Sequence, residues 1–292
     1  MSQARLAVDA RNRLGECPLW CERTGALYWT DIEASRISRL QAYGQLRHWT
    51  LSERVGSFAF CEGSTQQLLL GLASGIALFD LESEVLSPIA AVEADQPTTR
   101  INDGRCDRQG RFVFGMFNPA EEAIGHFYRV HADLRIERLP LRPVAVANSI
   151  CFSPDGATMY YTDSPKRTIW CLDYGADGSL GTPRVFTRLA KDEGFADGSC
   201  IDAEGGLWNA QWEGGCVVRY GVDGAETARL PLPVTRPTCP AFGGADLGTL
   251  YVTSARIGLD EQVLRGQPEA GGLFALPSRW RGLPESRFRL AR

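Results

Sequence analysis

Apolar and polar residues alternate along this chain in short stretches, and these stretches recur at a regular spacing. Each recurrence begins with a small or polar turn, runs into an apolar, aromatic-rich strand and usually continues into a second strand. The equivalent positions within the six units are Leu27, Leu69, Phe112, Met159, Leu207 and Leu250. Their spacing of 42 to 48 residues leaves room for four short strands in each unit.

The strands are enriched in β-branched and aromatic residues, and turn signals such as Pro154-Asp155-Gly156 and Asp177-Gly178 separate them. No segment of ten residues or more combines a helical apolar stripe with helix caps. Six such units predict an all-β fold, a six-bladed β-propeller with four-stranded antiparallel blades. A β-sandwich of repeats and a parallel β-helix are the alternatives, and the shorter repeat of a β-helix disfavours it.

We expect residues 1–292 to form a single β-propeller domain without an internal linker. We expect the N-terminal RLAVDA, residues 5–10, to begin a blade. The C-terminal RFRLAR, residues 287–292, is separated from the sixth unit by a stretch rich in Pro and Arg. We expect this C-terminal segment to return and complete a blade that the N-terminal segment begins.

Composition narrows the range of partners and compartments. The formal net charge is −4, so a strongly cationic field for nucleic acid or for an anionic membrane is absent. The start of the chain has no apolar signal core, and no apolar run is long enough for a membrane span. The nine cysteines are odd in number and form no C-x-x-C pair, which predicts reduced, buried thiols. We therefore predict a cytoplasmic protein.

The sequence lacks the residue patterns that several kinds of catalytic site require. The three histidines, His48, His126 and His131, stand apart without a zinc-binding pattern. The sequence has no G-x-S-x-G elbow, no phosphate-binding glycine loop and no EF-hand spacing. Nucleophilic catalysis by a Ser-His-Asp or Cys-His arrangement is therefore disfavoured, and oxygen ligands at turns remain.

Four polar residues share one phase of the repeat. Glu16, Asn102, Asn148 and Asp197 each precede the reference position of their unit by ten or eleven residues. In a propeller, equivalent positions meet around the axis, so these side chains should converge at one end of the channel. Glu16, Asn148 and Asp197 would offer two carboxylates and a carboxamide oxygen, which suit Ca²⁺, Mg²⁺ or Mn²⁺, with Zn²⁺ not excluded.

Each of these residues alone is an ordinary turn former or surface acid, and the shared phase carries the interpretation. In the second unit the same phase falls on Phe58. Phe58 fits an apolar wall of the same pocket and a core residue equally well.

Four motifs together resemble the gluconolactonase and regucalcin (senescence-marker-protein) family, over a span from Glu16 to about residue 277. They are L-G-E-x-P-x-W at 14–20, R-x-N-D-G at 100–104, A-N-S-I-x-F-S-P-D-G at 147–156 and x-D-G-S-x-x-D at 196–202. The resemblance implies a six-bladed propeller with one divalent metal at the channel mouth, and hydrolysis of sugar lactones.

The resemblance also implies roles for individual residues. Glu16, Asn148 and Asp197 resemble the metal ligands of the family, and Asp197 resembles its proposed acid/base. Arg100 and Asn102 resemble the pair that contacts substrate.

Two features depart from the family pattern. Cys17 stands where many relatives have Gly or Ser. The spacing after the third-unit strand is shifted, so that the acid expected to contact sugar hydroxyls is assigned to Glu121, with Asn118 and Glu122 left as alternatives.

The resulting hypothesis is metal-dependent hydrolysis of an aldonolactone, derived from arabinose, xylose, glucose or galactose, to the open-chain acid. The expected cofactor is one divalent cation, Ca²⁺ first, with Zn²⁺, Mn²⁺, Mg²⁺ or Fe²⁺ as alternatives. The rival hypotheses are a non-catalytic metal-binding propeller and a metal-dependent esterase or organophosphate hydrolase on the same fold. The expected partner is a small sugar lactone, with no nucleic acid and no membrane, and the chain is expected to be a monomer or a weak homo-oligomer.

Overall fold

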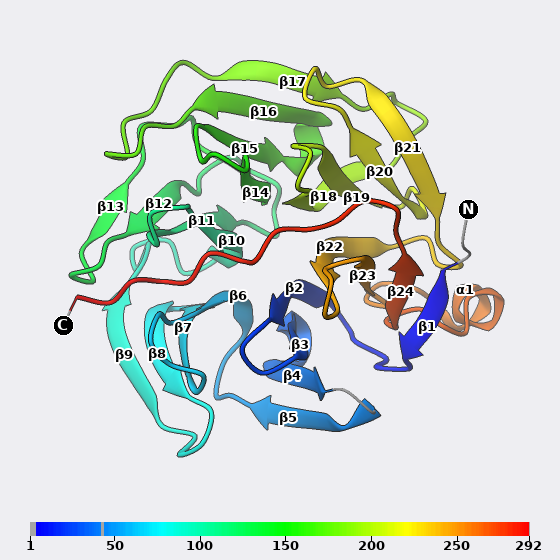
Figure 1. Cartoon of the computed structure of the whole chain (residues 1–292), viewed down its shortest axis with the longest axis horizontal. Coiled ribbons are helices and arrows are strands. Elements are labelled where there is room, and N and C mark those ends of the chain that lie inside the picture. The colour runs from blue at the N-terminus through cyan, green and yellow to red at the C-terminus, as the bar shows by residue number, and fades with distance from the viewer. Residues whose placement is uncertain (1–3, 42–43, 292) are drawn as a thin grey trace.

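The computed structural model describes residues 4–41 and 44–291, and it confirms the predicted six-bladed β-propeller (Figure 1). Each blade is a four-stranded antiparallel sheet whose first strand lies nearest the axis. Blade one comprises β2 (Gly15–Cys21), β3 (Ala26–Asp31), β4 (Arg36–Gln41) and β5 (Leu46–Thr50). Blade two comprises β6 (Val55–Phe60), β7 (Gln67–Leu72), β8 (Gly75–Asp80) and β9 (Leu86–Ala91). Blade three comprises β10 (Arg100–Cys106), β11 (Phe112–Phe117), β12 (Phe127–Val130) and β13 (Ile136–Arg138).

Blades four to six complete the ring, and a few short helices lie in the loops. Blade four comprises β14 (Ala147–Phe152), β15 (Thr158–Asp163), β16 (Thr168–Asp173) and β17 (Arg184–Arg188). Blade five comprises β18 (Phe195–Ile201), β19 (Leu207–Trp212), β20 (Cys216–Tyr220) and β21 (Glu226–Pro231). Blade six comprises β22 (Pro237–Gly243), β23 (Thr249–Ser254), β24 (Leu273–Pro277) and the N-terminal β1 (Arg5–Val8). The loop helices are η1 (Ile32–Ala34), η3 (Ser164–Lys166) and α1 (Glu261–Gly266).

The position of a strand within its blade explains its residue pattern. Inner strands such as β6 and β14 are buried along their whole length, because neighbouring blades cover both of their faces. Outer strands such as β9 are largely exposed or half-buried. The reference position of every repeat lies on the second strand of its blade and is fully buried. Because these strands are buried on both faces, the sequence shows a repeat of apolar segments and not a strict alternation of apolar and polar residues.

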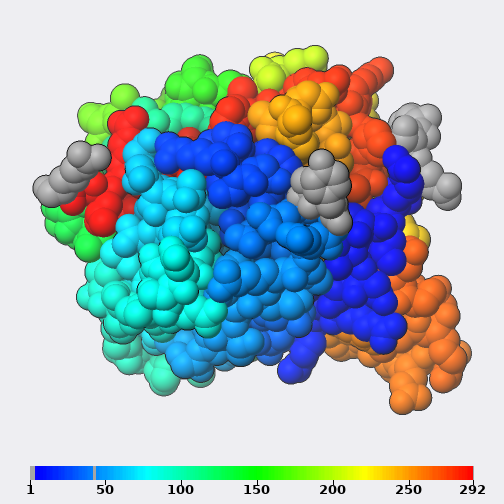
Figure 2. Space-filling model, turned by 60° about the horizontal axis from the view of Figure 1, so that its bottom comes forward, coloured from blue at the N-terminus to red at the C-terminus, as the bar shows by residue number. Residues whose placement is uncertain are grey.

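The ring closes through its N-terminal strand. β1 pairs antiparallel with β24, Leu6 opposite Phe274, and so becomes the outermost strand of blade six. Figure 2 shows the blue N-terminal segment lying against the orange part of the chain that precedes the C-terminus. The expectation for residues 5–10 is therefore right in kind, since they do supply a closing strand.

The expectation for residues 287–292 is wrong in its partner. The sixth unit already supplies three strands, so that β1 fills the one remaining edge. The C-terminal segment instead crosses the ring as an irregular strap (Figure 1), defined here as residues 279–291. The backbone N–H of Phe288 donates to the Phe60 carbonyl oxygen at 2.8 Å, and that of Arg289 donates to the Gly110 carbonyl at 2.9 Å.

The strap lies at the end of the channel where the inner strands finish. It reaches residues that come directly after inner strands, as in the bridges of Cys61 with Phe288 and of Asp202 with Gly282. In addition, Glu285 forms an ion pair with the channel residue Arg105 at 2.9 Å. The opposite end, where the inner strands begin, is left free of the strap.

The structure also shows the placement of the cysteines and of Phe58. All nine cysteines are free and buried. Phe58 is fully buried in a core cluster between blades one and two, so it is a core residue. No helix within residues 4–41 and 44–291 is long and apolar enough to cross a membrane.

Phe288→Ala tests the strap. The ring of Phe288 is fully buried, so truncation should lower the free energy of unfolding by about 3–5 kcal/mol. The exposed Val222→Ala serves as a control and should change it by less than about 0.5 kcal/mol. Urea unfolding followed by circular dichroism measures both. Equal, small effects of the two substitutions would mean that the strap does not contribute to the fold.

Candidate functional site

The inner strands deliver the predicted polar residues to one end of the channel. Glu16 is the second residue of β2, Asn148 the second of β14, and Asp197 the third of β18. The strand pairing shifts register directly after Glu16 and Asn148, and in β18 the shift includes Asp197, between Ala196 and Ser199. Such bulges turn a side chain out of the regular pleat, and here they aim three inner-strand side chains at the axis.

Two residues at these bulges have left-handed backbone conformations. Cys17, after Glu16, has φ 48°, and Ser149, after Asn148, has φ 59°. This conformation is unfavourable for residues other than glycine and is often found at functional sites. It also gives a physical reason why a small residue suits the position that Cys17 occupies.

The predicted side chains line a cavity of about 360 Å³. Its walls come from five blades. The lining residues are Leu14, Glu16, Glu33, Arg100, Asn102, Phe117, Glu121, Val146, Asn148, Ser164, Pro165, Phe195, Asp197, Trp212 and Ile257. Polar groups and an aromatic wall therefore share one small space, as is common in sites for small molecules.

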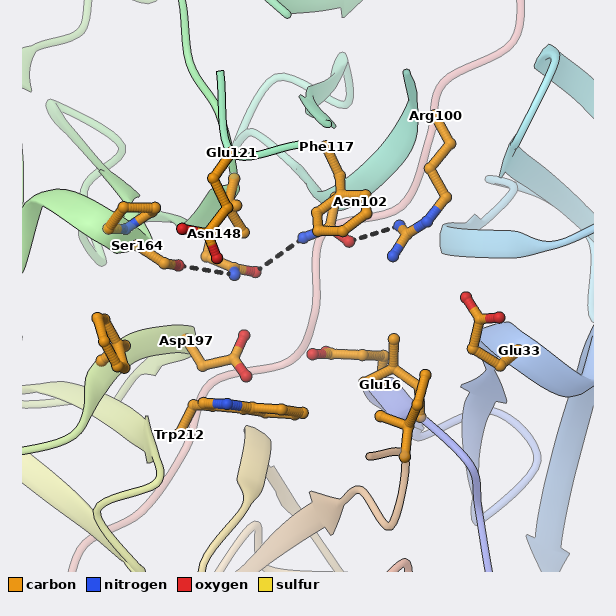
Figure 3. Close-up of a pocket in the computed structure, with 15 residues that line it drawn as sticks. Glu16, Glu33, Arg100, Asn102, Phe117, Glu121, Asn148, Ser164, Asp197 and Trp212 are labelled. Atoms are coloured by element: carbon orange, nitrogen blue, oxygen red, sulfur yellow. Dashed lines mark hydrogen bonds between the residues drawn. The ribbon is translucent and has the colours of Figure 1, made fainter. Parts of the chain in front are cut away.

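The carboxylates of Glu16 and Asp197 face one another across this cavity (Figure 3). Both side chains are buried. Burial, reinforced by the nearby Asp103 carboxylate, raises the pKa of Glu16 to about 8. Burial and the Glu16 carboxylate raise the pKa of Asp197 well above its usual range. Ionisation of both carboxyl groups would place two negative charges close together, so the arrangement favours a proton or a cation that neutralises them.

A chain of hydrogen bonds fixes the orientation of Asn148 (Figure 3). Its Nδ2 donates to Ser164 Oγ at 3.0 Å, and its Oδ1 accepts from Asn102 Nδ2 at 3.2 Å. Ser164 Oγ in turn donates to the Ala196 carbonyl at 2.7 Å. The carboxamide oxygen keeps a second lone pair, so it remains able to serve as a ligand.

The backbone below Asp197 is held by a buried polar network. Ser149 Oγ donates to the Asp197 carbonyl oxygen at 2.5 Å, and Asn209 Nδ2 donates to the same oxygen at 3.0 Å. Ser199 Oγ donates to Ser149 Oγ at 3.0 Å. These bonds join blades four and five and fix the position from which the Asp197 side chain projects.

The residues present fit a divalent cation. Glu16 and Asp197 supply two facing carboxylates, and Asn148 supplies a neutral oxygen of fixed orientation; oxygen donors of this kind suit Ca²⁺, Mg²⁺ or Mn²⁺. Within the described part of the chain, no group of three or more His, Cys, Asp or Glu is arranged to hold a metal ion. A cation here would therefore depend on the carboxamide as well as on the two acids.

Arg100 and Asn102 form the neighbouring part of the site. Arg100 Nη1 donates to Asn102 Oδ1 at 2.6 Å and to the Ile101 carbonyl at 3.1 Å. Its guanidinium lies 4.2 Å from the centre of the Phe117 ring. Burial lowers the pKa of Arg100 to about 10. The guanidinium is thus stacked, bonded and partly desolvated before any ligand arrives.

The three candidates after β11 differ in placement. Glu121 lines the cavity. Asn118 is buried, and its side chain stabilises the local turn by donating to the Glu122 carbonyl and accepting from the Ala120 N–H. Glu122 is exposed and is not among the lining residues. Of the three, Glu121 is the one whose placement suits contact with a ligand.

Sequence reasoning missed a second set of lining residues. Phe117, Ser164 and Trp212 each lie five residues after the reference position of their unit, where the second strand of the blade ends. Their shared phase was a usable signal, although their chemistry is too varied to suggest one role. Glu33 lies close to the same phase and was missed for the same reason.

Comparison with known proteins agrees with this geometry. The model of the family described as SMP-30/gluconolactonase/LRE-like region matches residues 14–256. An L-arabinolactonase from Azospirillum brasilense is 49% identical over 290 residues, which cover 98% of this chain and 95% of that protein. A 6-deoxy-6-sulfogluconolactonase from Pseudomonas putida is 36% identical and covers 90% of each chain.

Solved structures give the same result. The crystal structure of a calcium-binding protein, regucalcin, from Agrobacterium tumefaciens superimposes with a TM-score of 0.94 at 33% identity, over 99% of this chain and 98% of that one. The fold, the four motifs and the matched length agree. The chain belongs to the SMP-30/gluconolactonase/LRE-like family.

Proposed function

We propose that this chain hydrolyses a sugar lactone in a metal-dependent reaction, and that its substrate is a five-carbon aldonolactone of the arabinose type. The chain is a sugar lactone hydrolase by its family and by its similarity to two lactonases over nearly its whole length. The identity of 49% with an L-arabinolactonase supports the narrower choice of substrate. The cytoplasmic location and the monomeric or weakly oligomeric state stay predictions.

The observation that carries the proposal is the meeting of Glu16, Asn148 and Asp197 beside Arg100 and Asn102 in one cavity. The three oxygen donors would hold the cation. When bound, such a cation supplies Lewis-acid polarisation of a carbonyl oxygen. A non-catalytic metal-binding propeller would not require a guanidinium and a carboxamide prepared beside those donors.

The side chains of this site account for the remaining steps. A carboxylate oxygen of Asp197 accepts a proton as water attacks the lactone carbonyl carbon. The new C–O bond comes from water, the bond from that carbon to the ring oxygen breaks, and Asp197 returns the proton to the departing ring oxygen. The product is the open-chain hydroxy acid. Arg100 and Asn102 orient the ring and hydroxyl oxygens, and this positioning contributes to the rate.

The aromatic side of the cavity suits the apolar face of a sugar ring. Phe117, Phe195 and Trp212 line it, and Arg100 is stacked on Phe117. A plain ester or organophosphate would use this wall but would offer no hydroxyl group to Arg100, whose buried Nε has no hydrogen-bond partner among the described residues, and an unpaired buried donor weakens binding. The polar groups therefore favour the hydroxylated substrate over the esterase alternative.

Removal of the metal should abolish activity and leave the fold intact. After chelation, lactone hydrolysis followed by pH drop should fall to the spontaneous rate, and divalent cations added back should restore it. The far-ultraviolet dichroism of the β-strands should change little, because packing within and between blades supplies most of the folding energy. Full activity in rigorously chelated protein would contradict the metal requirement.

Asp197→Asn separates the two roles proposed for Asp197. The variant keeps a neutral oxygen ligand and loses the base, so turnover at saturating metal should fall by two or more orders of magnitude. Metal affinity measured by calorimetry should fall only modestly, because Glu16 keeps its charge. The exposed Asp246→Asn is the matched control and should leave both quantities unchanged. Turnover near that of the wild type would assign the proton transfer to another group.

Arg100→Ala tests substrate positioning. It should raise KM for hydroxylated aldonolactones much more than for an unsubstituted lactone ring, because the donors of Arg100 serve hydroxyl oxygens. Steady-state kinetics on both types of substrate measure the difference. An equal loss on both would place Arg100 at the reacting carbonyl instead.

A further inference from the structure

The charges that line the cavity are unequal. The charged side chains among its described lining residues are four carboxylates and one guanidinium, namely Glu16, Glu33, Glu121, Asp197 and Arg100. A divalent cation would balance Glu16 and Asp197. The remaining lining charges are the carboxylates of Glu33 and Glu121 and the guanidinium of Arg100, and Arg54, which is not a lining residue, forms an ion pair with Glu33.

Glu33 is the carboxylate that faces Arg100. It lies in η1, directly after β3, and Asp31 at the end of β3 anchors the segment by accepting the backbone N–H groups of Arg13 and Leu14 at 3.0 Å. Figure 3 shows the Glu33 carboxyl on the Arg100 side of the pocket, with Glu16 between it and Asp197. The Glu33 side chain is 20% exposed.

The partners of Glu33 leave part of it free. Its Oε1 accepts from Arg54 Nη1 at 3.3 Å, and no other hydrogen bond to this carboxylate is found in the described part of the chain. Arg54 comes just before β6 in blade two, and blade two contributes none of the described lining residues. Glu33 and Arg100 therefore enclose the cavity on the side of blade two.

Arg100 and Glu33 influence one another electrostatically. Burial lowers the pKa of Arg100, and the Glu33 carboxylate is the largest influence that opposes this decrease. Arg100 alone would attract an anionic group. The Glu33 carboxylate weakens that attraction although Arg54 acts in the opposite direction, and the donors of Arg100 and the second oxygen of Glu33 can still bond to hydroxyl groups.

We propose that Glu33 is a specificity-determining residue that makes this site select lactones with neutral, hydroxylated tails and discriminate against lactones with anionic tails. The proposal rests on the function proposed above and deepens it. A lactone whose carbonyl lies between Glu16 and Asp197 extends its tail toward Arg100 and Glu33. An anionic tail would meet the Glu33 carboxylate in a partly desolvated space, where like charges repel strongly.

Two substrates that differ only in the tail test this inference. They are glucono-1,5-lactone and 6-deoxy-6-sulfoglucono-1,5-lactone. The wild-type protein should prefer the neutral member. Glu33→Gln should lower the ratio of kcat/KM for the neutral lactone to kcat/KM for the sulfonated lactone by about tenfold or more, mainly through a lower KM for the sulfonated lactone. Added salt should reduce the difference between the variant and the wild type.

Two control variants separate charge from structure. Arg54→Gln breaks the same ion pair but keeps the cavity carboxylate, so the preference for the neutral lactone should persist or increase. Glu84→Gln removes a comparable ion pair on the surface, with Arg47 at 3.2 Å, and should leave the ratio unchanged. If Arg54→Gln lowered this ratio as much as Glu33→Gln does, the ion pair between Arg54 and Glu33, and not the charge of Glu33 in the cavity, would determine the preference for the neutral lactone.

A binding measurement keeps the test independent of turnover. Methyl α-glucopyranoside and its 6-deoxy-6-sulfo counterpart cannot open as lactones, and calorimetry can titrate both into metal-loaded and metal-free protein. Glu33→Gln should strengthen binding of the sulfonated ligand relative to the neutral one in both forms. Equal changes for the two ligands would overturn the role of Glu33. A protein that turns over no lactone but shows the expected binding shift would contradict the proposed function and leave Glu33 as the selective residue.

Discussion

The carboxyl groups of Glu16 and Asp197 are held face to face in a buried cavity, and the cost of ionising both of them is the constraint on which the rest of the site depends. The two side chains come from different blades, so they meet only when the ring is closed. Blade packing and closure by β1 must offset the unfavourable electrostatic energy. A divalent cation bound between them would relieve it, and this is the physical basis of the proposed metal requirement.

The local backbone shows how the sequence achieves this placement. Bulges at the start of the inner strands turn Glu16, Asn148 and Asp197 toward the axis, and Cys17 and Ser149 accept left-handed conformations to allow it. Hydrogen bonds between blades then hold Asn148 and the backbone of Asp197 in place. The strap binds the other end of the channel, so the molecule is reinforced without covering the cavity.

The repeat made most of this architecture predictable. Because every blade repeats the same strand order, the phase of Glu16, Asn148 and Asp197 was enough to bring them together, and the structure places all three in one cavity. Phase could not decide the role of Phe58, since only packing with the neighbouring blade shows that it is core.

Other features depended on contacts that no local pattern records. The strap replaced the expected closing strand because the edge of β24 is already occupied by β1. Glu33 belongs to none of the four motifs, and its place opposite Arg100, which lies on a blade two positions away, follows only from the closed ring. The sequence therefore did not predict which charged residues of distant segments lie close together.

The most direct test of the central claim is anomalous diffraction at the manganese edge from crystals grown with Mn²⁺. The account predicts a peak in the cavity, at about 2.0–2.6 Å from a carboxylate oxygen of Glu16, Oδ1 of Asn148 and a carboxylate oxygen of Asp197. The peak should weaken strongly or disappear in crystals of Glu16→Ala grown with the same limiting concentration of Mn²⁺, because this variant loses both a ligand oxygen and a negative charge. A fully occupied ion elsewhere with none between these three side chains would contradict the account.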